Sequence, residues 1–252
     1  MSAKLITAIL GRYNIDFIFE DKFGVLTRRA PSDNIEYILE TGNSCDAAPL
    51  MAALHAHGRF GTCFDVGANI GIVSAFLSSR SQAVYAFEPE PTNILRLRDT
   101  IKLNRCNNVT VCEMGVSKSS GQETLYVLDS YGHHSLGRVQ TSRITRSIEI
   151  PITTIDEYCS RNHIPYIDLL KVDVEGFEQE VLEGASQMLA AKRIGLIAFE
   201  IARVPLASLG KSAETIFGIL AANDYVVESL DGSPPPNTNL VEHCDLLAKP
   251  RR

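Results

Sequence analysis

Residues 64–71, with the sequence FDVGANIG, combine a carboxylate, an amide and two glycines at a spacing suited to holding a small ligand. They lie between an apolar run and an amphipathic run, which predicts a strand, a tight turn and the start of a helix. Gly67 and Gly71 let the backbone turn sharply and approach a ligand closely. The free N–H groups at the start of the helix favour an anionic group such as a carboxylate. A tight turn without a ligand is the alternative for the two glycines alone.

A second acid, Glu88, ends the next predicted strand. A carboxylate at this place can accept hydrogen bonds from both hydroxyls of a ribose. The two segments together predict a nucleoside-containing ligand, and both NAD and S-adenosylmethionine qualify. The NAD fingerprint G-x-G-x-x-G fails, because Asn69 stands at its second glycine and Ile72 at its third. Asp65 would repel a pyrophosphate and attract an ammonium, which favours S-adenosylmethionine.

A third segment, residues 170–178 with the sequence LKVDVEGFE, closes another apolar strand. Asp173 ends that strand beside the first one, which places it near the reactive end of the cofactor. Glu175 begins the following helix, where an acid also complements the helix dipole. Glu200 ends a further strand toward the same rim, and an ion pair with Arg203 is the alternative role for it.

S-adenosylmethionine donates a methyl group, and an acceptor that carries a proton needs a base or a metal to take that proton. A histidine pair in the loop sequence YGHHSL suits this role, because imidazole titrates near neutral pH; the alternative is two solvent-facing side chains. The candidate catalytic residues are His133, His134, Asp173, Glu175 and Glu200. Asp173 with Glu200 could instead hold a divalent cation. No close cysteine–histidine spacing predicts zinc, and we assign no metal.

From residue 60 onward, apolar strands alternate with amphipathic helices, which predicts an α/β fold with a mostly parallel sheet covered on both faces. The last two strands are joined without a helix, so we expect them to pair antiparallel. The predicted strands are 62–66, 83–87, 109–114, 167–172, 195–199, 225–229 and 245–248. The predicted helices are 46–57, 70–79, 91–104, 155–162, 176–189 and 213–222, and residues 123–152 read as a β-rich insertion.

The N-terminal part has a different pattern. Residues 14–40 read as short strands around a turn at 21–24. We therefore predict a small β extension at 1–45 and an S-adenosylmethionine-binding domain at 46–252, with Asp46 as the N-cap of its first helix. The N-terminal strands could serve a homodimer interface.

These motifs together resemble the FkbM family of methyltransferases over about residues 45–202. The strand-end segment with the Asp-Val-Glu-Gly core is the most specific part of the resemblance. The matching residues are those at 65–71, 87–89, 104, 135–136, 154–156 and 171–176. The resemblance implies a Rossmann-like class I methyltransferase fold, with seven strands in the order 3-2-1-4-5-7-6. It also implies O-methylation of hydroxyls, often on sugars of glycans or on secondary metabolites.

The same resemblance implies roles for individual residues. The methionine portion of the cofactor would be held by Asp65, Gly67, Asn69 and Gly71. Glu88 would hold the ribose, the backbone around Gly115 would flank the adenine, and Asp173 would lie near the methyl group. Residues 58–61, GRFG, depart from the usual glycine–acid approach of the family, so the acceptor is left open.

Composition limits the partners. The net charge of −6 and the 7% aromatic content disfavour an RNA methyltransferase with the same cofactor site, and we expect no nucleic acid partner. Arg138, Arg143 and Arg146 form the one basic stretch; it reads as solvated surface or as a contact to an anionic acceptor. No apolar run reaches the length of a membrane span, and no signal-peptide pattern is present, so we expect a cytoplasmic protein. A non-catalytic scaffold is the last alternative, against which the acids at 65, 88 and 173 count.

Overall fold

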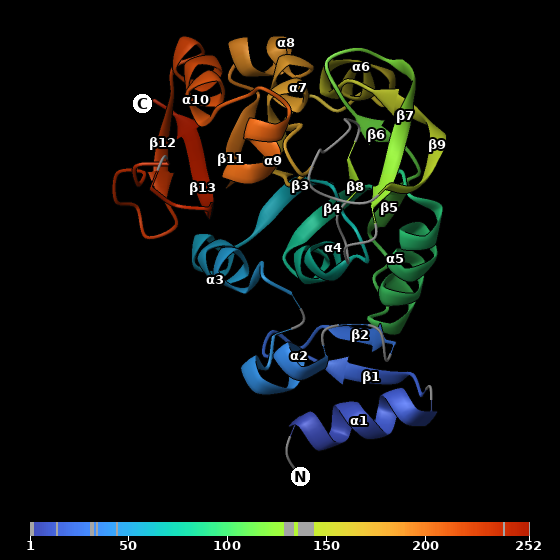
Figure 1. Ribbon diagram of the computed structural model, residues 1–252. Coiled ribbons are helices and arrows are strands. Elements are labelled where there is room, and N and C mark those ends of the chain that lie inside the picture. The colour runs from blue at the N-terminus through green and yellow to red at the C-terminus, as the bar shows by residue number, and fades with distance from the viewer. Residues whose placement is uncertain are drawn as a thin grey trace.

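A seven-stranded sheet forms the centre of the computed structural model, which describes residues 3–13, 15–30, 33, 35–43, 45–128, 134–135, 144–238 and 240–251. Its strands are β3 (Phe60–Val66), β4 (Ser81–Phe87), β5 (Val109–Cys112), β10 (Ile167–Val172), β11 (Ile194–Ala202), β12 (Tyr225–Ser229) and β13 (His243–Pro250). They lie in the order β12-β13-β11-β10-β3-β4-β5 (Figure 1). Every neighbouring pair is parallel except the two that contain β13. The predicted fold class, strand order and antiparallel pair are thereby confirmed.

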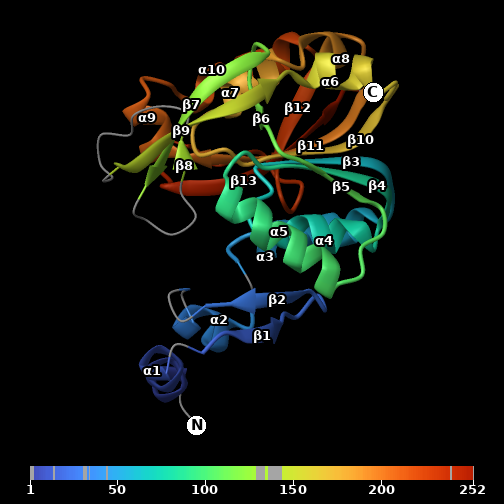
Figure 2. The same cartoon turned by 90° about the vertical axis from the view of Figure 1, so that its right-hand side faces the viewer.

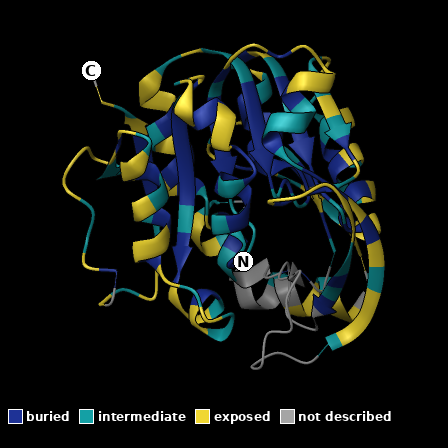
Figure 3. Ribbon diagram, turned by 90° about the horizontal axis from the view of Figure 1, so that it is seen from above, coloured by how far each residue is buried: buried dark blue, intermediate teal, exposed yellow. Residues whose placement is uncertain are grey.

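Helices cover both faces of this sheet (Figure 2). One face carries α3 (Ala48–His57), α4 (Ile72–Ser78) and α5 (Pro91–Leu103). The other carries α6 (Ile155–Arg161), α7 (Glu178–Glu183), α8 (Ser186–Ala190) and α10 (Ala213–Ala222). Successive strand side chains point to opposite faces, so Phe64 and Leu170 join the core under α6, α7 and α10, whereas Cys63 and Leu169 join the core under α3 and α4. The central strands are accordingly buried (Figure 3).

A second, four-stranded sheet forms the predicted β-rich insertion. It contains β6 (Gly115–Val116), β7 (Gly121–Leu128), β8 (His134–Ser135) and β9 (Ile144–Thr153), in the order β6-β9-β7-β8. The predicted strand 109–114 was too long: β5 ends at Cys112, and β6 pairs with β9 instead of continuing the central sheet. Leu125, Ile150 and Ile152 form the small apolar core of this second sheet.

The N-terminal part contains more helix than the sequence indicated. It consists of α1 (Ala3–Tyr13), β1 (Phe17–Glu20), β2 (Leu26–Arg29) and α2 (Ile35–Thr41). The two strands pair antiparallel around the predicted turn, but the strand interpretation was wrong for α2. Ile38 is buried, and in such a short helix packing of this kind outweighs the strand preference of isoleucine. Among the described residues, no helix has the length and apolar character needed to cross a membrane.

Polar contacts join this N-terminal part to α5. The Asn104 side chain accepts a hydrogen bond from Leu26 N at 2.9 Å and donates one to Leu26 O at 2.7 Å. Arg96 pairs with the buried Asp33 at 2.6 Å. Asn104, which the family resemblance includes, therefore has a structural role in the described contacts.

Three further boundaries differ from the prediction. The helix predicted from residue 46, α3, starts after Ala47 with Pro49 in its first turn, so Asp46 is not its N-cap. The predicted helix 176–189 is broken into α7 and α8 at Gly184, where a Cβ would lie 2.2 Å from the carbonyl oxygen of Ser117. A short helix, α9 (Arg203–Ser208), was not predicted.

Candidate cofactor site and acidic rim

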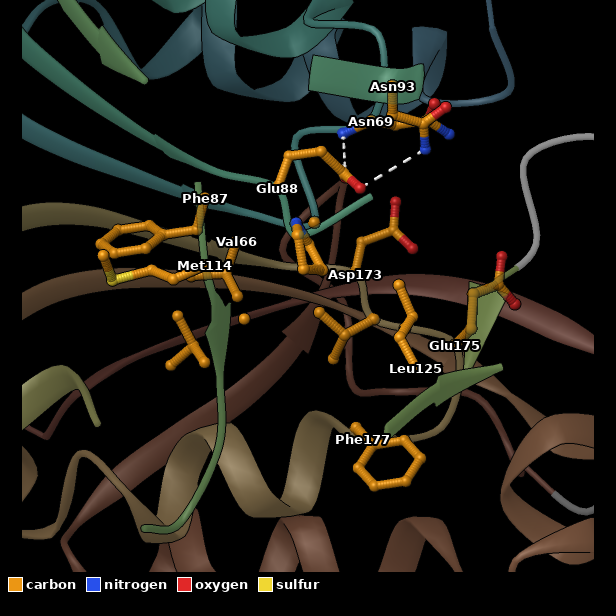
Figure 4. Close-up of a pocket in the computed structure, with 15 residues that line it drawn as sticks. Val66, Asn69, Phe87, Glu88, Asn93, Met114, Leu125, Asp173, Glu175 and Phe177 are labelled. Carbon is orange, nitrogen blue, oxygen red and sulfur yellow. Dashed lines mark hydrogen bonds between the residues drawn. The ribbon is translucent and has the colours of Figure 1, made fainter. Parts of the chain in front are cut away.

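A cavity opens at the carboxyl ends of β3, β4 and β10, where the strand order reverses. Its walls enclose about 720 Å³, a volume that includes open solvent at the mouth. Figure 4 shows Glu88 and Asp173 directed toward the same part of this cavity, with Phe87, Met114 and Leu125 as apolar wall. The cavity therefore joins polar strand ends to an apolar surface.

The glycine turn after β3 forms one side of the cavity. Gly67 lines the cavity with φ of 78°, and a Cβ at this position would lie 1.8 Å from the carbonyl oxygen of Asp173. Asn69, at φ of 50°, also lines it. Gly71 has φ of 85° and packs against Leu97, where a Cβ would lie 2.4 Å from Cδ1. Gly71 is thus explained by close packing and lies outside the cavity lining.

Glu88 is buried at the end of β4 and is held by three donors. Its Oε2 accepts from Asn69 N at 2.8 Å, and its Oε1 accepts from Glu90 N at 3.0 Å and from Asn93 Nδ2 at 3.4 Å. Figure 4 shows the contacts with Asn69 and Asn93. Burial raises the pKa of Glu88 to about 7, against the opposing effect of the hydrogen bonds. A further donor that enters the cavity would stabilise the carboxylate form.

Asn93 was missed by the sequence analysis. It lies in the first turn of α5, whose N-cap Glu90 accepts a hydrogen bond from Asn93 N at 2.7 Å. Its side chain lines the cavity beside Glu88. The sequence Glu90-Pro91 marks the helix start, and an asparagine three residues after the cap was the available signal.

Asp65 does not line the cavity, contrary to the direct ligand contact expected from the sequence. It is fully buried; Ser74 Oγ donates to its Oδ2 at 2.6 Å, and Lys171 Nζ lies 3.1 Å from its Oδ1. Parallel pairing of β3 with β10 places Lys171 directly beside Asp65. Lys171 also donates to Gly67 O at 2.8 Å. Asp65 therefore supports the glycine turn indirectly, through its ion pair with Lys171.

The buried Lys171 ammonium connects the turn to the third motif. It lies 3.4 Å from Asp173 Oδ2 as well as 3.1 Å from Asp65. Burial alone would lower the pKa of Lys171, but the two carboxylates outweigh it and raise the pKa. A permanent positive charge therefore sits between these two acids.

Three carboxylates form an acidic rim beside the cavity. The ligand oxygens of Asp173, Glu175 and Glu200 all lie within 4.8 Å of one another. Burial, with Asp173 and Glu175 as neighbours, raises the pKa of Glu200 to about 7. Oxygen atoms at this spacing could hold a divalent cation, and the same crowding also favours a shared proton.

His243 is the partner of Glu200, and the pair with Arg203 considered from the sequence is not formed. His243 Nε2 lies 2.5 Å from Glu200 Oε1, and this hydrogen bond raises the pKa of His243 to about 9. Antiparallel pairing of β11 with β13 brings the two residues to the same sheet edge. Nothing local to His243 in the sequence indicates this pairing.

The remaining predicted site residues are placed only in part. His133 lies outside the described residues. Of His134 only the backbone is described, and it pairs in β8 with Val127 of β7. Arg138 and Arg143 also lie outside them. Arg146 pairs with Glu90 at the α5 N-terminus.

Gly115, which the family resemblance places beside the adenine, lines the cavity at the start of β6. A Cβ at this position would lie 3.2 Å from Cγ2 of Ile152 in β9. The backbone of Gly115 therefore borders the cavity next to the apolar Met114 and Val116.

Residues 65–227 match the family described as the methyltransferase FkbM domain. The chain belongs to this family. The resemblance seen in its motifs is thereby confirmed. The chain is 32% identical over 128 residues to the hexuronic acid methyltransferase AglP of Haloferax volcanii, and the aligned region covers 50% of each chain. It is 25% identical over 145 residues to the 2-O-methyltransferase NoeI of Sinorhizobium fredii, which covers 51% of this chain and 59% of NoeI.

This FkbM-family chain spans about half the length of the curated relatives it matches. Solved structures agree with its fold. Methyltransferase FkbM of Methylobacillus flagellatus superposes with a TM-score of 0.51 at 16% identity, covering 98% of this chain and 58% of that one. A 16S rRNA methyltransferase of T. thermophilus gives a TM-score of 0.51 at 13% identity, covering 94% and 50%. At these identities the likeness extends to the fold alone.

Proposed function

We propose that this FkbM-family protein binds S-adenosylmethionine and transfers its methyl group to a hydroxyl of a sugar, a glycan or a secondary metabolite. The observation that carries the proposal is Glu88, a buried carboxylate aimed into the cavity at the end of β4. The family match supports methyl transfer. The names of the two relatives, a hexuronic acid methyltransferase and a 2-O-methyltransferase, support a sugar hydroxyl as acceptor.

The residues of the cavity fit this cofactor. Hydroxyls of a ribose would donate to Glu88, whose pKa of about 7 shows that its charged form lacks full stabilisation. The apolar wall of Phe87, Met114 and Leu125 suits a purine ring, with the Gly115 backbone at its edge. The turn at Gly67 and Asn69 would contact the methionine portion. In this proposal Asp65 acts indirectly, through Lys171.

When bound, S-adenosylmethionine supplies a methyl group on a positively charged sulfur. The protein must hold the acceptor oxygen in line with that group. For well-aligned reactants, positioning can lower the activation barrier by up to about 7–11 kcal/mol. Asp173 lies in the cavity lining and in the acidic rim, so it marks the boundary between cofactor and acceptor.

Glu200 is the base that the described geometry favours. A carboxylate with a pKa of about 7 can accept a proton from a hydroxyl at neutral pH. His243, whose side chain is 46% exposed, connects Glu200 Oε1 to solvent and offers a route for the proton. Asp173 and Glu175 share the rim, and a base from His133 or His134 stays a prediction.

Two organisational predictions from the sequence also stay proposals. The first is the division of the chain into an N-terminal extension at 1–45 and a cofactor-binding domain at 46–252. The second is a homodimer through the N-terminal strands β1 and β2. Size measurement in solution, on the full chain and on a chain with charges placed on β1, would test the second.

Calorimetry with S-adenosylhomocysteine, with NADH as the control ligand, tests the cofactor. We expect micromolar binding of S-adenosylhomocysteine, no binding of NADH, and strong weakening by Glu88→Ala. Glu113→Ala is the matched control, because Glu113 is a half-exposed acid after β5 that pairs with Arg98 outside the cavity. Absence of binding by folded protein would contradict the proposal and favour a non-catalytic scaffold.

The acceptor is tested by release of S-adenosylhomocysteine from S-adenosylmethionine. A panel of methyl glucuronide, methyl glucosides and small phenols represents the three hydroxyl classes. We expect turnover with at least one hydroxyl compound and none with its deoxy analogue. Methylation of an amine or a thiol in place of every hydroxyl would overturn the O-methyltransferase assignment.

A further inference from the structure

Glu178 is a fully buried carboxyl group that has no place in the cavity lining or in the acidic rim. It is the first residue of α7, and its side chain is 0% exposed. Burial raises the pKa of Glu178 to about 8. A buried carboxyl group is costly unless hydrogen bonds compensate it, so its contacts indicate what it does.

Those contacts are made to the loop between β10 and α7. Glu178 Oε1 accepts from Val174 N and from Gly176 N, each at 3.1 Å. The two donors flank Glu175, which has φ of 54°, a left-handed conformation that residues other than glycine rarely adopt. One oxygen atom of Glu178 thus holds both sides of a strained residue in place.

The same loop supplies both functional surfaces. Asp173, Glu175 and Phe177 line the cavity, and Asp173 and Glu175 belong to the acidic rim. Its backbone also packs directly on the glycine turn, because the Asp173 carbonyl oxygen occupies the place where a Cβ of residue 67 would stand. A shift of this loop would therefore move the turn that borders the cofactor cavity.

Only one of the two carboxyl oxygens takes part. Glu178 Oε2 is buried and has no hydrogen-bond partner among the described residues. At pH 7 a carboxyl group with a pKa of about 8 is mostly neutral, so a glutamine that keeps an acceptor oxygen at the position of Oε1 should support the loop nearly as well. Simple complementarity with the α7 dipole would instead require the negative charge.

We propose that Glu178 is a positioning residue: its Oε1 holds residues 173–177 against the Gly67 turn and so sets cofactor affinity without touching the cofactor. The inference rests on the proposed function, since it takes the cavity to be the S-adenosylmethionine site. It assigns to Glu178 a hydrogen-bonding role that depends on an acceptor oxygen and not on charge.

Calorimetry with S-adenosylhomocysteine on Glu178→Gln and Glu178→Ala tests this role, with thermal unfolding measured on the same samples. We expect Glu178→Ala to lose about tenfold or more in affinity, and Glu178→Gln to stay within about threefold of wild type. Glu183→Ala is the matched control on the same helix. The Glu183 carboxylate accepts a hydrogen bond from Gln179 Nε2 at 2.8 Å and does not line the cavity. Equal loss in the Gln and Ala variants, or wild-type affinity in a folded Ala variant, would overturn the proposal.

Amide hydrogen exchange in the cofactor-free protein gives a second readout, which holds even where Glu178→Ala fails to fold. We expect the amides of Val174 and Gly176 to be protected in wild type and in Glu178→Gln. Exchange of both at the rate of an unstructured peptide would contradict the contact. If wild type shows this protection but binds no S-adenosylhomocysteine, the proposed function fails while the hydrogen-bonding role of Glu178 stands.

Discussion

Glu88 and Glu200 are two largely buried acids at the carboxyl edge of one sheet, and burial raises the pKa of each to about 7. Their neighbours differ. Glu88 is surrounded by N–H donors from Asn69, Glu90 and Asn93, whereas Glu200 faces the carboxylates of Asp173 and Glu175. The N–H donors around Glu88 suit a group that accepts hydrogen bonds, whereas the carboxylates around Glu200 suit a group that takes up a proton. The difference separates a binding end of the site from a proton-transfer end.

The largest effect that separates the two ends is expected from Glu200→Gln. The amide keeps the size of the side chain but cannot take a proton, so kcat for methyl transfer should fall by about 100- to 10,000-fold. The affinity for S-adenosylhomocysteine should change little, because Glu200 lies outside the cavity lining. Steady-state kinetics and calorimetry on the same variant check both. A kcat near that of wild type would remove Glu200 as the base.

Glu88→Gln should produce the opposite pattern. The amide is a weaker acceptor than a carboxylate, and hydrogen bonds to charged groups are worth about 1.5–3 kcal/mol each, so affinity should fall by about tenfold to a hundredfold. Once the site is saturated, kcat should stay within a small factor of wild type. Calorimetry and saturation kinetics measure the two quantities. Loss of kcat without loss of affinity would reverse the roles of the two acids.

The pH dependence of binding sharpens the comparison. The charged form of Glu88 accepts hydrogen bonds from a ligand, so binding must displace a proton when the pH is below the free-state pKa of about 7. Affinity for S-adenosylhomocysteine should therefore fall by up to about tenfold per unit as pH drops from 7 to 5. Calorimetry in two buffers of different ionisation enthalpy counts the released proton. The same pH dependence in Glu88→Gln would assign it to another group.

The smallest effect is expected from His243→Ala. The hydrogen bond from His243 lowers the pKa of Glu200, so its removal should raise that pKa and move the acid limb of kcat/KM to higher pH. At pH 7 the value of kcat/KM should fall about two- to tenfold, because a smaller fraction of Glu200 is ionised. A pH–rate profile with an acceptor from the hydroxyl panel measures the shift. A limb that moves to lower pH would contradict the proposed pair.

Local sequence patterns predicted much of the fold, because β3, β4, β10 and β11 are short apolar runs that are each followed by a helix. They also predicted that Glu88 and Asp173 directly follow β4 and β10, whereas Glu200, expected at a strand end, lies within β11 two residues before its last residue. They failed for α1 and α2, where short helices near the N-terminus carry strand-forming residues. Tertiary contacts outweigh local preference in such elements.

Partners that meet through strand register could not be predicted in this way. Lys171 reaches Asp65 because β10 pairs in parallel with β3, and His243 reaches Glu200 across 43 residues because β13 returns antiparallel to β11. The sequence contains these residues, but only the pairing makes Asp65 a buried support and His243 a partner of the rim. The structure therefore differs from the sequence-based predictions more in the roles of side chains than in the positions of strands and helices.

Side-by-side calorimetry of Glu88→Gln and Glu200→Gln with S-adenosylhomocysteine at pH 8 tests the separation most directly. At this pH both wild-type carboxyl groups are mostly ionised, so the comparison is free of their titration. The account predicts that Glu88→Gln binds about tenfold or more weakly while Glu200→Gln binds as wild type does. Equal affinities for the two folded variants would contradict it.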